Sequence, residues 1–363
     1  MNNINGQPVV SFCIPVYNKA EIAAKIVNGI LVSDDPRFEV IACDNASTDN
    51  TPEVLSQIHD PRFRYVRNEK AIKPVKNWLK ALELGRGKWL YFVIGRDRIN
   101  GEHIHRLIEL LDYAEKNGIT FLQDGYTRKK EPVVYSGIEA MIKFINCLHP
   151  TGSVFRRDIF EAIPDRESYL TRSDMYPENF LRRDMLLKGM GVSIRSGVYI
   201  DPSSLFDWTK VKSTNEHDMK LYDTFYAPKR RTVLFFEMMD MIASDFPDKF
   251  TDKEIDKYFG SKFREFLNWV STGWRGCCRN PKWQAHYGQK VTHIGLAEMV
   301  RNIFKAYSDT KAYLLKKGIY SSTRQRIMYR KMCRMLAKAA AKAVLEPLGM
   351  WEMLKAVKQK ILH

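Results

Sequence analysis

Two stretches, VVSFCIPVYN at residues 9–18 and FEVIACDNASTDNT at residues 38–51, decide the fold class of this 363-residue chain. In each, an apolar and partly β-branched run stops at polar residues, which predicts strands over Val9–Pro15 and Phe38–Cys43. Between them, the helical spacing of apolar residues over Lys19–Val32 predicts a helix. A strand, a helix and a second strand in this order favour two parallel strands joined by a right-handed crossover.

The same alternation continues through the first half of the chain. We expect further strands at Phe63–Val66, Trp89–Ile94, Thr120–Gln123, Val133–Tyr135, Val192–Ile194 and Val198–Ile200, and helices at Thr51–Ile58, Lys73–Leu84, Gly101–Asn117 and Tyr176–Lys188. This predicts an α/β fold of Rossmann-like type, a mostly parallel twisted sheet flanked by helices, over residues 1–225. From about Tyr226 the pattern is nearly all helical, so we expect a helical region at 226–323 and a basic tail at 324–363.

The composition indicates a protein without membrane spans. No apolar run approaches the roughly 18–20 residues that cross a bilayer. The first residues, MNNINGQPVV, lack the basic and apolar segments of a secretion signal. The six cysteines form no C-x-x-C pair, which argues against a zinc site or a disulfide framework. We therefore expect a cytoplasmic protein.

The positive charge is concentrated at the end of the chain. Residues 324–363 hold ten Lys or Arg residues against two Glu residues, which is half of the net charge of +16. A basic amphipathic tail can lie on an anionic membrane at the inner face of the plasma membrane. Alternatively, the tail packs on the protein with its cations in solvent. The helices before it can pack the tail or form a homodimer contact.

Nucleic acid is not an expected partner, although the chain is basic. The sequence has no RNP-like aromatic pattern, no zinc-ligand spacing and no recognition-helix signal.

Asp44 stands at the end of a predicted strand, beside a turn rich in Ser and Thr. A carboxylate there can accept hydrogen bonds from the N–H of a nucleobase or from a ribose hydroxyl. The competing interpretation is an Asx turn that begins a helix, which any α/β protein can use. The polar end of the first strand, at Tyr17 and Asn18, favours a binding role because ligands of such sheets lie beyond the carboxyl ends of the strands.

Ile14–Asn18 and Asp44–Thr51 resemble the two opening motifs of the family 2 glycosyltransferases, Pro-x-Tyr-Asn and Asp-Asp/Asn-x-Ser-x-Asp-x-Thr. The resemblance covers Pro8–Gly101 well and thins out toward Gly191. It implies a GT-A fold and the inverting transfer of a sugar from a nucleotide-diphosphate sugar to a hydroxyl of a glycan or lipid-linked glycan. The implied setting is bacterial surface-polysaccharide synthesis, such as lipopolysaccharide or capsule. The residues that it implies around the donor nucleotide are Pro15, Tyr17, Glu21, Asp44 and Asn77.

The family's third motif is an apolar strand that ends in clustered aspartates, which hold Mg²⁺ or Mn²⁺ against the diphosphate. This chain has Gly95-Arg96-Asp97-Arg98 at that place, so Asp97 alone is kept. Either Asp97 still holds the divalent cation, or Arg96 or Arg98 neutralises the leaving diphosphate through bidentate hydrogen bonds. A third interpretation is a catalytically inactive or regulatory nucleotide-sugar-binding protein.

The family's catalytic base comes from an acidic pair at the start of a helix that ends at a glycine. Tyr176-Pro177-Glu178-Asn179, before Gly189, is similar to this pattern and implies Glu178 as the base. Pro177 suits the first helical turn, which places Glu178 at the positive end of the helix dipole. The alternative is that Glu178 only stabilises its own helix. Asp174 and Asp184 are the reserve candidates.

A turn at residues 149–153, HPTGS, resembles the loop beside the acceptor in these enzymes. The resemblance implies acceptor contacts from His149, Thr151 and Gly152, because glycine lets backbone approach a sugar closely. An ordinary proline turn would have the same composition.

Overall fold

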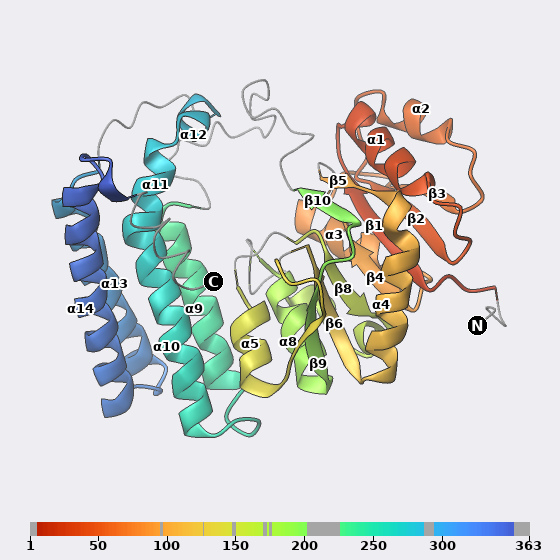
Figure 1. Ribbon diagram of the computed structural model, residues 1–363. Helices are drawn as coiled ribbons and strands as arrows, with labels where there is room; N and C mark the ends of the chain where they lie inside the picture. The colour runs from red at the N-terminus through yellow and green to blue at the C-terminus, as the bar shows by residue number, and fades with distance from the viewer. Residues whose placement is uncertain are drawn as a thin grey trace. The chain divides into compact units, whose positions relative to one another are not determined.

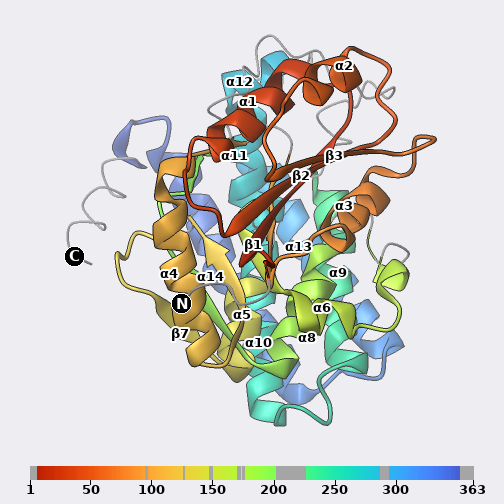
Figure 2. The ribbon, with the colours of Figure 1, turned by 90° about the vertical axis from the view of Figure 1, so that its right-hand side faces the viewer.

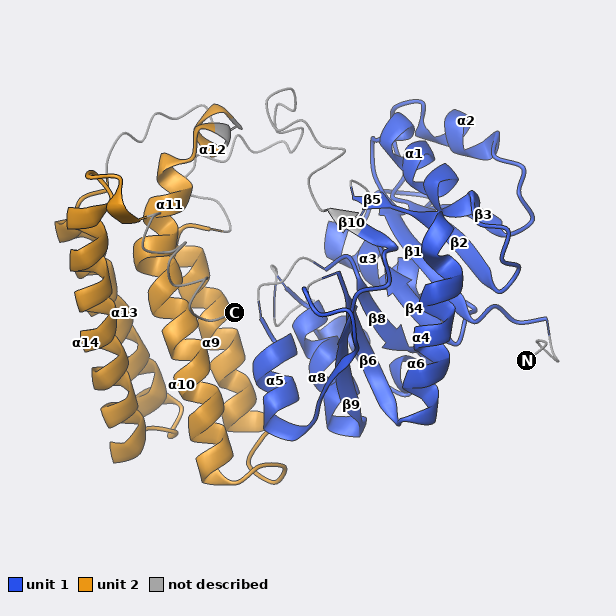
Figure 3. Cartoon of the chain, in the orientation of Figure 1, with its two compact units in different colours: residues 1–207 blue, residues 208–363 orange. Residues whose placement is uncertain are grey.

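The computed structural model describes residues 6–94, 97–125, 127–146, 150–169, 173, 176–201, 226–286 and 294–351. The chain divides into two compact units between Asp207 and Trp208 (Figure 3). The sequence pattern had placed this boundary at residue 225. The two units are described separately below.

Unit 1 alternates strands and helices along the chain (Figure 1). Its strands are β1 (Val10–Val16), β2 (Phe38–Asp44), β3 (Phe63–Arg67), β4 (Trp89–Phe92), β5 (Arg98–Ile99), β6 (Ile119–Asp124), β7 (Val133–Tyr135), β8 (Ser153–Arg156), β9 (Met190–Ile194) and β10 (Tyr199–Asp201). Its helices are α1 (Ala20–Leu31), α2 (Thr51–Ser56), α3 (Pro74–Glu83), α4 (Ile104–Lys116), α5 (Gly137–Phe144), α6 (Arg157–Glu161) and α8 (Glu178–Lys188), with short 3₁₀ turns at Gly101–His103 and Arg166–Ser168.

Eight of these strands form one sheet in the order β3-β2-β1-β4-β8-β6-β9-β7, and β10 pairs with β5. The predicted α/β fold is confirmed, but the sheet is mixed. Strand β8 runs antiparallel to both β4 and β6, and β7 runs antiparallel to β9. The sequence analysis had assigned no strand to the residues of β8, because a run of only four residues carries little periodicity.

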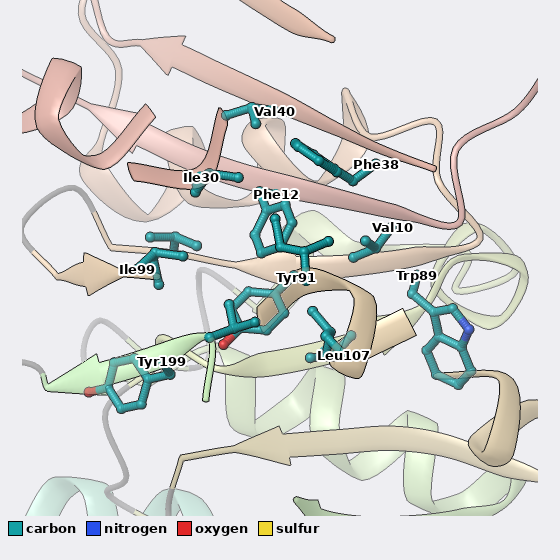
Figure 4. Close-up of a cluster of buried hydrophobic side chains, with 14 of the residues drawn as sticks. Val10, Phe12, Ile30, Phe38, Val40, Trp89, Tyr91, Ile99, Leu107 and Tyr199 are labelled. Atoms are coloured by element: carbon teal, nitrogen blue, oxygen red, sulfur yellow. The ribbon is translucent and has the colours of Figure 1, made fainter. Parts of the chain in front are cut away.

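One face of the sheet packs against α1 and α4. Alternate residues of the central strands share this core, as expected for a pleated strand, and Figure 4 shows Phe12 of β1 beside Tyr91 of β4. The Phe12 and Tyr91 ring centroids lie 5.0 Å apart, and Phe38 meets Phe12 edge-on at 6.0 Å. Each such buried ring contributes about 1.5–3 kcal/mol relative to an exposed one.

The other face of the sheet packs against α3 and α8, and Figure 2 shows α1 and α3 on opposite sides of β1 and β2. Cys13 of β1 and Cys43 of β2 are buried. Burial raises the pKa of the Cys43 thiol to about 11 and that of Cys13 above its usual range. Both thiols are therefore inert core residues.

Unit 2 is helical where it is described, as expected from the sequence. Its helices are α9 (Pro228–Ser244), α10 (Asp252–Asn268), α11 (Trp274–Arg279), α12 (Pro281–His286), α13 (Leu296–Lys316) and α14 (Ser322–Leu345), with a π-helical turn at Trp269–Gly273. Helix α10 begins with a capping box between Thr251 and Glu254. Phe235 of α9 stacks on Phe266 of α10, with ring centroids 4.4 Å apart.

Helix α14 is the described part of the predicted basic tail, and it packs against α10 and α13 within unit 2. Met328, Met332 and Met335 form its buried face, so this apolar stripe is core. Arg326, Arg330 and Arg334 are exposed. Across the stretches that the structure describes, no helix is both long and apolar enough to span a bilayer.

Candidate active site

The topology brings four of the predicted site residues, Asp44, Asp97, Thr151 and Glu178, to one edge of the large sheet. Strands β1, β2, β4 and β6 share one direction, so their carboxyl ends lie at the same edge. Asp44 ends β2, Asp97 follows β4, and Thr151 precedes β8, which starts at this edge because it runs the opposite way. Helix α8 leads into β9, which is parallel to β6, so Glu178 at the start of α8 lies at this edge too.

The loops after β1 and β2 are bonded to each other. The Asn18 amide N–H donates to Ser47 Oγ at 2.9 Å, and the Thr48 amide N–H donates to Asn18 Oδ1 at 2.8 Å. Asn18 and Ala46 both have positive φ, at 49° and 57°. Positive φ costs a non-glycine residue on the order of 1–3 kcal/mol and is concentrated at functional sites. The sequence motif predicted the two loops, but it did not predict that hydrogen bonds of Asn18 hold them together.

Asp44 is fully buried and accepts hydrogen bonds from three groups. Ser47 donates through its amide N–H at 3.0 Å and its hydroxyl at 2.5 Å, and the Tyr65 hydroxyl donates at 2.7 Å. Arg67 Nε lies 3.4 Å from Asp44 Oδ2. The sequence analysis missed Tyr65 and Arg67, which the pairing of β3 with β2 places here. These contacts hold the Asp44 carboxylate in one orientation at the end of β2.

The other residues predicted around the nucleotide differ in exposure. Tyr17 is 47% exposed just beyond β1, and Glu21 is exposed in the first turn of α1. Pro15 is buried within β1 opposite Cys43.

Asn77 is buried, and its side chain forms hydrogen bonds to backbone and side-chain groups of the protein. Its Nδ2 donates to the Cys43 carbonyl at 2.9 Å, and its Oδ1 accepts from Asn68 Nδ2 at 2.9 Å. Asn68 also donates to Asn45 at 3.1 Å. The three asparagines therefore tie the end of β2 to the segment before α3.

Thr151 connects the end of β4 to Asp97. Its hydroxyl oxygen accepts from the Ile94 amide N–H at 2.8 Å and donates its proton to Asp97 Oδ2. Thr151 and Asp97 are both fully buried. The loop that the sequence assigned to the acceptor thus supports the residue that it assigned to the diphosphate.

Gly152 holds the ends of two strands together. Its amide N–H donates to the Phe92 carbonyl at 3.1 Å, and its carbonyl accepts from the Asp124 amide N–H at 2.8 Å. Its φ is +84°, and an added Cβ would lie 2.5 Å from the Asp124 carbonyl oxygen. Glycine is required here for packing of backbone on backbone.

Arg98 is exposed on β5. Arg96 and His149 lie outside the described residues, as does Asp174.

The donor set for a metal ion is small. Within the described ranges, no group of three or more His, Cys, Asp or Glu side chains has the arrangement of a metal site. Mg²⁺ is often held by one or two carboxylates together with substrate phosphates and water. Asp97 therefore suits only a cation whose other ligands come mostly from a diphosphate and from water.

Glu178 is the first residue of α8 and is 6% exposed. Neither carboxylate oxygen has a hydrogen-bond partner among the residues that the structure describes. Burial raises the pKa of Glu178 to about 7, and the nearby charge of Arg182 opposes this only in part. Burial therefore outweighs the helix dipole, and the carboxylate can take up a proton near neutral pH.

Asp184, the reserve candidate for the base, is held by two neighbouring side chains. It accepts the hydroxyl proton of Tyr169 and pairs with Arg183 at 2.8 Å.

Asp124, at the end of β6, was missed by the sequence analysis. It accepts from the Tyr91 hydroxyl at 2.9 Å and from the Ser196 amide and hydroxyl at 2.9 and 2.5 Å. Burial raises its pKa above the usual range. Its place after an apolar strand, as for Asp44, was the signal that could have found it.

Known proteins resemble this chain in sequence and in fold. Residues 11–189 match the family described as Glycosyl transferase family 2. The abequosyltransferase RfbV of Salmonella typhimurium is 26% identical over 173 residues, 45% of this chain and 47% of that protein. The UDP-Glc:alpha-D-GlcNAc-diphosphoundecaprenol beta-1,3-glucosyltransferase WfaP of Escherichia coli is 25% identical over 174 residues, 44% of this chain and 67% of that protein.

The solved structure of S. aureus TarS has a TM-score of 0.56 and 13% identity, and the match covers 92% of this chain and 55% of TarS. The matched stretches span 29–47% of the length of the first curated relatives. Residues 11–189 therefore form a glycosyltransferase family 2 domain, and the likeness to TarS supports its GT-A fold.

Proposed function

We propose that this chain transfers a sugar, with inversion, from a nucleotide-diphosphate sugar to a hydroxyl of a glycan or lipid-linked glycan in cell-surface polysaccharide synthesis. The observation that carries the proposal is the pair of buried carboxylates at one sheet edge, Asp44 with its partners and Glu178 without any among the described residues. The names of RfbV and WfaP, which are sugar transferases, support it.

In this proposal the donor nucleoside lies over the loops after β1 and β2. Asp44 accepts the N–H of the base, and the exposed ring of Tyr17 covers the base or the ribose. Pro15 and Glu21 border this region. Asn77 stabilises the end of β2 through its hydrogen bond to the Cys43 carbonyl. Since Asp44 is fully buried, the base has to displace Arg67, which is the exposed member of the cluster.

The chemical step assigns the acceptor proton to Glu178. The acceptor hydroxyl gives its proton to the Glu178 carboxylate while its oxygen forms a bond to the anomeric carbon. The bond from that carbon to the diphosphate oxygen breaks, and its electron pair leaves with the nucleoside diphosphate. Attack opposite to the leaving group inverts the anomeric centre.

The leaving diphosphate needs positive charge near Asp97. A divalent cation held by Asp97 would supply it as a Lewis acid. Alternatively, Arg96 or Arg98 forms hydrogen bonds to the diphosphate oxygens. Thr151 keeps Asp97 in place in either case, and His149, Thr151 and Gly152 border the acceptor.

A catalytically inactive nucleotide-sugar-binding protein is the second candidate. The single carboxylate after β4 favours it, because the described residues contain no cluster of metal ligands. Donor turnover separates the two candidates.

We further propose that the protein is cytoplasmic and rests on the anionic inner face of the plasma membrane. The exposed row of Arg326, Arg330 and Arg334 on α14 supports electrostatic attachment. The buried methionine face rules α14 out as a helix that inserts by that stripe. A lipid-linked acceptor, as in the name of WfaP, would be met at this surface.

Replacing each carboxylate by its amide should separate binding from chemistry. Glu178→Gln should lower kcat about 100-fold or more and leave the Kd of the nucleotide unchanged, because only proton transfer is lost. Asp44→Asn should raise the donor KM about tenfold or more with a smaller effect on kcat. Steady-state kinetics and calorimetry with a panel of nucleotide sugars measure both. Near-normal transfer by Glu178→Gln would refute the base assignment.

The raised pKa of Glu178 should make the stability of the protein fall and the transfer rate rise as the pH increases. Its folded pKa of about 7 lies above the ordinary 4.5, so the native state keeps a proton that the unfolded chain has released. Stability should fall as pH rises from about 4.5 through about 7, by at most about 3 kcal/mol, while the transfer rate rises as the base ionises. Urea unfolding of the wild type and Glu178→Gln across this range tests the first part. Equal pH dependence of the two proteins would contradict it.

Chelation should decide how the diphosphate charge is neutralised. We expect EDTA to abolish transfer, Mn²⁺ or Mg²⁺ to restore it, and Asp97→Asn to lose the response to the metal. The opposite result is full activity in EDTA together with a loss of about 100-fold in Arg98→Ala or Arg96→Ala. That result would assign the role to an arginine.

Charge reversal on α14 should weaken membrane binding. The double variant Arg330→Glu/Arg334→Glu should bind vesicles rich in phosphatidylglycerol more weakly than the wild type, and high salt should release the wild type. Lys129→Glu/Lys130→Glu, at exposed positions in unit 1, makes the same charge change and serves as control. Equal loss in both variants, or equal binding to phosphatidylcholine vesicles, would contradict a site on α14.

A further inference from the structure

A fully buried arginine, Arg182, follows the proposed base Glu178 by four residues on α8. Residues four apart on a helix share one face, so the two side chains are neighbours. Taking a guanidinium group out of water is costly unless its donors find acceptors inside the protein. A cation in such a place also acts electrostatically on a nearby acid.

The guanidinium group of Arg182 contacts three elements of unit 1. Its Nη2 donates to Ser153 Oγ at 2.9 Å at the start of β8, and its Nη1 donates to Asn179 Oδ1 at 3.2 Å in the first turn of α8. Nη1 also lies 3.4 Å from the carbonyl oxygen of Phe144, the last residue of α5. Asn179 Oδ1 accepts in addition from the Asn146 amide N–H at 3.2 Å. These bonds hold the first turn of α8, which begins with the proposed base, against α5 and β8.

Arg182 acts on Glu178 through its charge and not through a hydrogen bond. Both Glu178 oxygens are buried without a hydrogen-bond partner among the described residues, and the donors of Arg182 go to the acceptors named above. Burial raises the pKa of Glu178 to about 7, and the charge of Arg182 opposes that rise. The arginine therefore favours the carboxylate form of Glu178 while the two oxygens stay open.

Other titratable groups around Glu178 are engaged elsewhere. Arg166 and Tyr169 line the same small pocket as Glu178, and the residues of α3 in that lining are apolar or aromatic. Arg166 donates to three backbone carbonyls, and the Tyr169 hydroxyl donates to Asp184. Among the described residues, the cation that acts on Glu178 is thus Arg182.

We infer that Arg182 is a positioning residue for the proposed base: its charge favours ionised Glu178 without a hydrogen bond, and its donors hold the helix turn that carries Glu178. The role of Glu178 as the base rests on the proposed function. An arginine in a direct ion pair would favour ionisation too, but it would occupy the oxygens that have to take the acceptor proton. The arrangement around Arg182 supplies the charge and leaves these oxygens available.

The pH profile of transfer separates this effect of charge from a purely structural role. Arg182→Met removes the charge and keeps an unbranched side chain, so the pH at which the rate reaches half of its plateau should rise by about one unit. The plateau at high pH should be largely retained, because Glu178 is ionised there. Arg182→Lys keeps the charge and should keep the wild-type midpoint, although its hydrogen bonds differ. Arg182→Gln, a neutral and polar replacement, makes the same test if Arg182→Met does not fold.

Arg183→Met is the matched control. It makes the same charge change at the next residue, whose guanidinium group pairs with Asp184 at 2.8 Å, and it should leave the midpoint unchanged.

A second measurement needs no turnover. The difference in unfolding free energy between each protein and the same protein carrying Glu178→Gln, measured in urea, follows the ionisation of Glu178. In the wild type this difference should fall as the pH rises and level off above about pH 7. In Arg182→Met it should go on falling to a pH about one unit higher.

An unchanged midpoint in Arg182→Met, in either measurement, would overturn the inference, and so would an equal shift in Arg183→Met. If the unfolding data show the shift but none of the proteins turns over a donor, the role of Arg182 stands and the proposed transfer reaction fails. If transfer is observed and its midpoint is the same in the wild type and in Arg182→Met, the role of Arg182 fails and the reaction stands.

Discussion

The backbone bonds of Gly152 are the constraint on which the candidate active site depends. The Gly152 amide N–H donates to the Phe92 carbonyl at the end of β4, and the Gly152 carbonyl accepts from the Asp124 amide N–H at the end of β6. They fix the place where β8 enters the sheet, and the preceding residue, Thr151, is thereby held against Ile94 and Asp97. A side chain at residue 152 would collide with the Asp124 carbonyl oxygen, so the position of Asp97 depends on glycine at residue 152.

The two carboxylates of the proposed mechanism, Asp44 and Glu178, differ in environment. This difference matches the different roles that we propose for them. Asp44 accepts hydrogen bonds from Ser47 and Tyr65 and lies beside the Arg67 guanidinium. Glu178 is buried beside apolar and aromatic side chains, which raise its pKa to about 7. A carboxylate held by hydrogen bonds suits the anchoring of a ligand, whereas a buried acid with a raised pKa suits proton transfer near neutral pH. Sequence motifs cannot show this difference in environment, because in the sequence each residue is only an acidic side chain near the end of a strand or the start of a helix.

The sequence predicted the fold well where periodicity was strong. The bounds of β2, α1 and α3 agree with the apolar pattern to within one residue at each end. It did not predict β8, whose antiparallel direction is set by its neighbours in the sheet. The same limit applies to the site: Asp44 follows from a local motif, whereas Tyr65 and Arg67 reach it through strand pairing. Trp78 of α3 and Glu178 of α8 line one small pocket although they are about a hundred residues apart in the chain, so no local pattern indicates that they meet.

Helix α14 shows how a basic amphipathic pattern can serve two purposes. Its methionine face is used within unit 2, where Met328, Met332 and Met335 are buried against α10 and α13. Arg326, Arg330 and Arg334 follow one another at intervals of four residues on the same side of the helix, where like charges disfavour the helix slightly. Packing of the methionines against α10 and α13 offsets that cost. The exposed arginine row, rather than the buried apolar stripe, is therefore the part of this helix that is available to an anionic partner.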